Sequence, residues 1–126
     1  MIDLYCERCD AGFWAEPLNA LTNASFLVAA FLAWRSAKSR RVVTAEIGIL
    51  VALAATIGVG SFLFHTFATE WAKWLDVIPI LLFQVWFIWV YSRQQLGCSR
   101  VTSGGMLGGL VALALLADPQ KEILNG

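Results

Sequence analysis

The sequence is poor in the side chains from which most soluble active sites are built. It has one histidine, three cysteines and only 14% charged residues among 126, and its formal net charge is zero. Three cysteines are too few for a disulfide framework, and zero net charge gives no indication of a nucleic-acid partner. Residues 1–16 are acidic and lack an apolar core, so we expect no secretory signal peptide.

Apolar side chains are what the chain has in excess. Hydrophobic residues make up 59% of it, more than a soluble domain of this length usually carries. Four apolar stretches approach the roughly 20 residues that cross a bilayer core, namely 18–34, 45–67, 74–91 and, more weakly, 101–117. We therefore predict an all-α, polytopic transmembrane helix bundle that forms a single domain over residues 1–126.

The basic residues predict how these spans are oriented. Arg35, Lys38, Arg40 and Arg41 lie between the first two spans, and short loops rich in Lys and Arg stay on the cytoplasmic side. The N-terminus is then on the non-cytoplasmic side, and the second span runs outward. The basic loop after residue 91 falls inside again. We expect an integral, multi-pass membrane protein.

This topology brings polar residues of three spans to one depth. Ser61 and His65 are four residues apart near the outer end of the second span, and Asp76 opens the third. Glu16, Asn19 and Asn23 lie three and four residues apart around the start of the first span, so they share one helix face. Polar side chains in apolar spans are costly and usually functional. Each alone also fits a capping or packing role, but together they indicate a site.

Imidazole is the commonest protein ligand for a catalytic metal, which makes His65 a candidate zinc ligand. Asp76 could then orient and deprotonate a metal-bound water, and Ser61 could donate a hydrogen bond to a developing oxyanion. A Ser–His–Asp triad is less well supported, because the strained turn that exposes a nucleophilic serine is absent. Cys6 and Cys9 form a lone CxxC, so a thiol-redox function stays open as a weaker alternative.

At these residues the chain resembles the alkaline ceramidases, a family within the seven-span membrane hydrolases that include the adiponectin-type receptors. The resemblance covers about residues 3–90. It is carried by four motifs: Tyr5-Cys6-Glu7, Ala15-Glu16-Pro17-Leu18-Asn19, Gly58-Val59-Gly60-Ser61-Phe62-Leu63-Phe64-His65 and Asp76-Val77-Ile78-Pro79.

The resemblance implies a hydrolase of linear amide bonds, which cleaves a ceramide-like lipid into a fatty acid and a sphingoid base. It implies zinc at His65, with Ser61 and Asp76 as catalytic residues. It also implies calcium in the acidic head. Glu7 and Glu16 match that calcium pattern best, and Asp3 and the Tyr5 carbonyl are further candidates. Cys9 stands where the family has an oxygen ligand.

The family pattern has seven spans and two further zinc histidines, an His-x3-His pair on the last span. This chain has about four spans and one histidine. We therefore expect it to be the N-terminal part of such a protein, or a divergent form whose missing ligands come from another chain. A non-catalytic module on the same scaffold, such as a receptor-like or assembly subunit, is the alternative function. The oligomeric state is left open.

Overall fold

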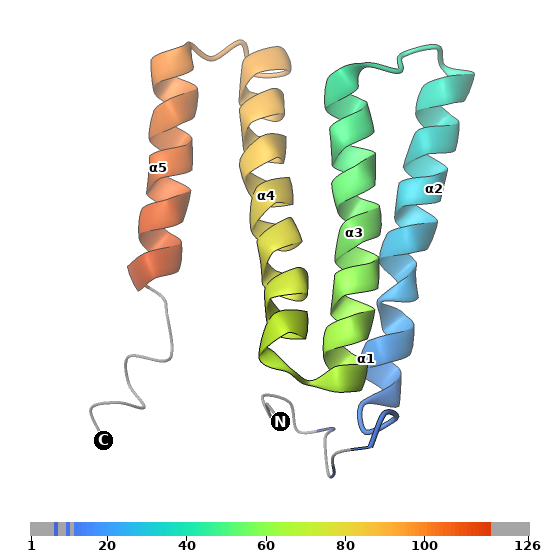
Figure 1. The fold of residues 1–126 in the computed structure, drawn as a ribbon. Helices are drawn as coiled ribbons and strands as arrows, with labels where there is room; N and C mark the ends of the chain where they lie inside the picture. Colours follow the sequence, from blue (N-terminus) through green and yellow to red (C-terminus); the bar gives the residue numbers. More distant parts are fainter. Residues whose placement is uncertain (1–6, 8–9, 11, 117–126) are drawn as a thin grey trace. The chain divides into compact units, whose positions relative to one another are not determined.

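The computed structural model describes residues 7, 10 and 12–116. All regular secondary structure in these residues is α-helical, which confirms the predicted all-α class (Figure 1). The helices are α1 (Pro17–Thr22), α2 (Ala24–Ser39), α3 (Ala45–Phe67), α4 (Glu70–Gln94) and α5 (Arg100–Leu116).

Three helical stretches of the described chain are long and apolar enough to cross a membrane. The α3 stretch has the predicted bounds, Ala45–Phe67, and the stretches Pro17–Ser39 and Glu70–Gln94 contain the other two strong predictions. α5 has 17 residues and reaches the end of the described residues. The fourth span, 101–117, therefore stays a prediction.

The first apolar stretch is interrupted at Asn23, where α1 ends and α2 begins. Polar side chains around this point bond to nearby backbone carbonyls. The Thr22 hydroxyl donates to Leu18 O at 2.8 Å, and the Asn23 side-chain amide donates to Asn19 O at 2.8 Å. Such local bonds compete with the regular helical pattern, which accounts for a break at the Thr-Asn pair.

A tight connection joins α3 to α4 and sets the level of the candidate residues. α3 ends at Phe67, and the residue that follows it, Ala68, adopts a left-handed conformation (φ 47°, ψ 47°) and donates its N–H to Phe64 O at 2.8 Å. This is a common way to terminate a helix, although alanine is less suited to it than glycine. α4 begins two residues later, at Glu70. The last turns of α3 therefore lie beside the first turns of α4.

The chain forms two compact units, Met1–Gln84 and Val85–Gly126, and α4 runs through the boundary between them. In the first unit α2 packs antiparallel to α3, and α1 also packs on α3 (Figure 1). The single-domain organisation stays a prediction. All the candidate site residues that the structure describes belong to the first unit.

In the second unit, the end of α4 and the start of α5 are joined through buried serines. The Ser92 hydroxyl donates to the Ser103 hydroxyl at 2.8 Å, and Ser103 is fully buried. The Arg93 guanidinium donates to Cys98 O at 2.5 Å across the connecting loop. Interhelical hydroxyl bonds of this kind stabilise helix pairs in apolar surroundings.

A double-mutant cycle on Ser92→Ala and Ser103→Ala tests this contact. The two changes should be coupled by about 0.6 kcal/mol, the usual size for an interhelical hydrogen bond in a membrane protein. The measurement is the free energy of unfolding in mixed detergent. Ser39, which is exposed and bonds the Ser36 carbonyl of its own helix, provides a control pair with Ser92 that should be additive. Zero coupling between Ser92 and Ser103 would contradict the assignment.

Candidate functional site

Two pairs of buried polar side chains meet around the end of α3. The first pair joins α1 to α3. The Nδ1 atom of His65 lies 2.5 Å from Oε2 of Glu16, and only 7% and 2% of these residues' surfaces are exposed. The Asn19 side-chain amide donates to the same Glu16 oxygen at 3.4 Å. The Glu16 carboxylate is therefore in contact with polar side chains of both α1 and α3.

The second pair joins α3 to α4. The Ser61 hydroxyl donates to Oδ1 of Asp76, and both residues are buried, at 5% and 7% exposure. The predicted neighbours on α3 and α4 are thus in direct contact. A hydroxyl has a single proton, so this bond uses the only donor of Ser61. It holds the Asp76 carboxylate against the Ser61 side chain.

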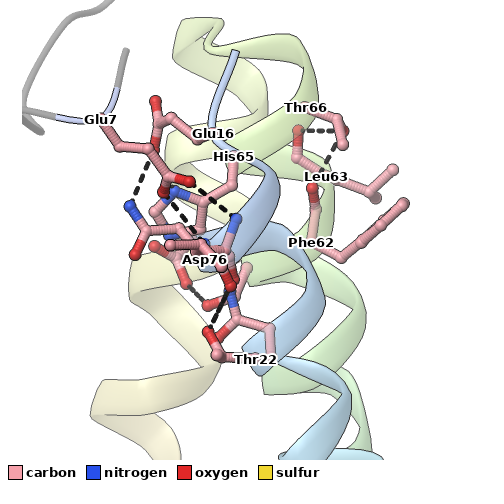
Figure 2. Close-up of polar contacts among 12 residues, drawn as sticks. Glu7, Glu16, Thr22, Phe62, Leu63, His65, Thr66 and Asp76 are labelled. Atoms are coloured by element: carbon pink, nitrogen blue, oxygen red, sulfur yellow. Dashed lines mark hydrogen bonds and ion pairs between the residues drawn. The ribbon is translucent and has the colours of Figure 1, made fainter. Parts of the chain in front are cut away.

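The two pairs are neighbours because Ser61 and His65 are four residues apart on α3. Side chains at this spacing lie on one helix face, with Cβ atoms about 5–6 Å apart. Figure 2 shows Glu16, His65 and Asp76 gathered on one side of α3, while Thr66 lies on the other side. The Thr66 hydroxyl donates to the carbonyls of Phe62 and Leu63 in its own helix. The structure therefore joins the predicted residues Ser61, His65 and Asp76 with Glu16.

The Gly58-Val59-Gly60 motif lets α3 approach a neighbour on each side. A Cβ atom on Gly58 would lie 3.1 Å from Leu27 Cγ and 3.2 Å from Asn23 O of the α1–α2 arm. A Cβ atom on Gly60 would lie 2.0 Å from Leu75 O of α4, which is an impossible distance. Small residues allow such close helix contacts. The approach at Gly60 brings Asp76, the residue after Leu75, within reach of Ser61.

Pro79 explains why the Leu75 carbonyl can lie against Gly60. Proline has no N–H, so Pro79 cannot donate the helical hydrogen bond to the carbonyl four residues before it, which is that of Leu75. Pro79 lies inside α4. The carbonyl is thus available to approach the Gly60 backbone, where a Cα–H···O contact is possible. Gly60 and Pro79 both belong to the sequence motifs, but the motifs do not predict the contact between Gly60 and the Leu75 carbonyl.

The predicted calcium residues have other partners in the described part of the chain. Both carboxylate oxygens of Glu7 accept backbone N–H groups at the start of α1, from Leu18 at 2.7 Å and from Asn19 at 3.1 Å. Glu16 contacts His65, a partner that the sequence had not revealed. Asp3 lies outside the described residues. Calcium binding by this head stays a prediction.

A zinc site is only partly represented among the described residues. His65 offers one imidazole, but residues 7, 10 and 12–116 contain no cluster of three or more His, Cys, Asp or Glu that could hold a metal ion. A catalytic zinc site needs three protein ligands. These residues alone therefore do not complete the predicted zinc site. Zinc at His65 stays a prediction, and Cys6 and Cys9 lie outside the described residues.

An apolar cavity of about 170 Å³ lies one turn further along the interface between α1–α2 and α3. It is lined by small and aliphatic side chains and one aromatic ring: Ala20, Leu21, Ala24, Leu27, Gly58, Val59 and Phe62. Ala20 follows Glu16 by four residues, and Phe62 precedes His65 by three. The cavity therefore continues the Glu16–His65 interface with a surface suited to hydrocarbon.

Replacing Gly60 by Ala tests the close approach of α3 and α4. The new methyl group meets backbone atoms of α4, so the helices must separate, and we expect a loss of about 1–3 kcal/mol of unfolding free energy. Gly48→Ala is the matched control, because it is in α3 with nothing within 4 Å of its added Cβ. That change should be neutral or stabilising by about 0.5–1 kcal/mol. Equal effects of both substitutions in detergent unfolding would refute the packing role of Gly60.

Comparison with known proteins identifies the family. The family model described as Ceramidase matches residues 5–118, which is most of the chain and includes both buried pairs. Searches of curated proteins and of solved structures gave no significant match. The match extends the resemblance noted at the sequence motifs across the whole helical region. The chain belongs to the ceramidase family.

Proposed function

We propose that this protein is a membrane-embedded, zinc-dependent hydrolase of the amide bond in ceramide-like lipids. The observation that carries the proposal is the pair of buried contacts, Glu16–His65 and Ser61–Asp76, on one face of α3. Membership of the ceramidase family supports the reaction class. The long apolar helices support a membrane location, and the basic residues 35–41 support a non-cytoplasmic N-terminus.

The chain's own residues suit amide hydrolysis. Attack of water on the amide carbonyl carbon needs a group that accepts a proton from the water and a donor for the oxygen that becomes negative. Asp76 is the candidate proton acceptor. The Ser61 hydroxyl donates its one proton to Asp76 in this structure, and it becomes the candidate donor to the oxyanion when it turns from Asp76 to the substrate. The C–N bond then breaks, and the leaving amine takes the proton that Asp76 accepted from the water. The products are a fatty acid and a sphingoid base.

His65 is the residue that would hold zinc, together with ligands beyond those that the structure describes. A bound zinc ion supplies Lewis-acid activation of water and carbonyl. The apolar cavity beside Glu16 and His65 suits a hydrocarbon chain of the substrate, since it is lined by Ala, Leu, Val, Phe and Gly. A polar reaction centre next to an apolar cavity matches the two parts of a lipid amide.

Substitutions in the two pairs test the proposed roles. We expect His65→Ala to abolish fatty-acid release from ceramide, Ser61→Ala to lower it about 10²–10³-fold, and Asp76→Asn to lower it about 10²–10⁴-fold. The assay uses membranes of a host without its own ceramidase activity. Thr66→Val is the matched control for loss of a buried hydroxyl, because Thr66 lies on the other side of α3, and it should keep activity. Undiminished hydrolysis by His65→Ala would contradict the proposal.

Metal removal tests the zinc requirement separately. A strong zinc chelator should reduce hydrolysis to background, and added Zn²⁺ should restore it while Ca²⁺ alone should not. Activity that persists in zinc-free membranes would rule out the zinc role. If the wild-type protein neither hydrolyses ceramide nor binds zinc in stoichiometric amount, a non-catalytic module on the ceramidase scaffold becomes the better explanation.

A further inference from the structure

The connection between α2 and α3 carries exposed positive charge that the site described above does not use. Figure 1 shows this connection at the end of the α2–α3 pair away from α1. All four basic side chains there are exposed, and within residues 7, 10 and 12–116 none of them forms a hydrogen bond or ion pair. They are Arg35, Lys38, Arg40 and Arg41. Glu46 is the single acidic residue between Pro17 and Thr69, so this charge is largely uncompensated.

The backbone of this connection is well defined. α2 ends at Ser39, and Arg41 adopts a left-handed conformation with φ 56°. The Val42 N–H donates to Ala37 O at 3.0 Å. The Arg41 N–H donates to Lys38 O at 3.2 Å. These two bonds form the Schellman motif that ends many helices, and its left-handed position is usually glycine because a Cβ atom disfavours that conformation.

The known roles of basic loops do not explain an arginine at this position. Orientation by the positive-inside rule requires only that the charge lie in the loop. Neutralising the end of the α2 dipole is a role for Lys38, which is in the last turn. Neither role needs a side chain at the residue where glycine is favoured. A non-glycine residue in left-handed backbone supports a function for its side chain, here the guanidinium of Arg41.

The neighbouring residues place this charge at the level of lipid headgroups. Trp34 precedes the basic residues, Val42 and Val43 follow them, and all three are exposed. Tryptophan is typical of the membrane–water interface, and the apolar stretches on either side enter the hydrocarbon. A guanidinium binds phosphate through two parallel N–H groups, and basic clusters at the end of a membrane helix attract anionic lipids.

We infer that this basic loop, formed by Arg35, Lys38, Arg40 and Arg41, binds the phosphate headgroup of an anionic phospholipid. Such binding requires the proposed membrane location but no hydrolase activity. The loop lies at the start of α3, whereas Ser61 and His65 lie near its end, ~30 Å away at 1.5 Å per residue. The bound lipid is therefore a different molecule from the substrate, held in the opposite leaflet.

Native mass spectrometry of the full chain in an uncharged detergent tests the inference without any mutation. The protein is titrated with phosphatidylglycerol or with phosphatidylcholine, and the dissociation constant of the first bound lipid is measured for each. We expect phosphatidylglycerol to bind at least fivefold more tightly, with a preference that shrinks as salt is added, because salt screens exposed charges. Equal affinities for the two lipids would overturn the inference. Inorganic phosphate that bound as tightly as the lipid would overturn the assignment to a lipid.

The variant Arg41→Gly separates lipid binding from stability. Removing one cation near the headgroup should weaken phosphatidylglycerol binding about fivefold and leave phosphatidylcholine binding unchanged. Because glycine suits the left-handed backbone, the unfolding temperature should stay the same or rise. A lower unfolding temperature, or unchanged phosphatidylglycerol binding, would contradict the role given to Arg41.

Lys73→Gln is the charge-matched control, because it removes one positive charge from α4, near the end of α3 that lies away from the basic loop. It should leave the lipid preference unchanged. An equal loss in Lys73→Gln and Arg41→Gly would mean that net charge alone attracts the lipid, and would overturn the assignment to this loop. If a variant fails to fold, the comparison of the two lipids on the wild-type chain still decides.

Discussion

The structure around the site depends on the need to satisfy two carboxylates that are buried among apolar helices. A charged group taken out of water loses several kcal/mol of solvation unless it is hydrogen-bonded or paired. Glu16 and Asp76 come from α1 and α4, and α3 supplies a polar partner to each, His65 and Ser61. One helix face therefore determines where both of its neighbours can place their polar groups.

Such short side-chain contacts require the backbones to be close, and the glycines of α3 provide this. Gly58 faces the α1–α2 arm, and Gly60 faces the Leu75 carbonyl of α4. On the α4 side the arrangement also involves Pro79, which cannot bond to that carbonyl. The Gly-x-Gly-Ser-x3-His and Asp-x2-Pro motifs thus combine packing residues and polar residues in one structural unit. A change in the packing residues should disturb the polar contacts through the helix separation.

The N-terminal head contributes to the same unit through α1. Glu7 accepts hydrogen bonds from two N–H groups at the start of that helix. These groups have no partner within the helix and carry partial positive charge. This leaves the N-cap glutamate, Glu16, for the contact with His65. Glu7 can therefore affect the Glu16–His65 contact, because its carboxylate occupies the N–H groups at the start of α1.

The sequence by itself determined the helical class, the three long apolar stretches, the family and the identity of the polar residues, because hydropathy and motif spacing are local properties of the chain. The predicted span topology also placed Ser61 and His65, near the end of the second span, at one level with Asp76, at the start of the third. Only the tertiary structure decided the partners. It paired Glu16 with His65 rather than with its own helix, and Ser61 with Asp76, and it placed Gly60 against Leu75. These choices depend on the distances between helices and on competition between carboxylates for the same N–H groups, and no local pattern records either.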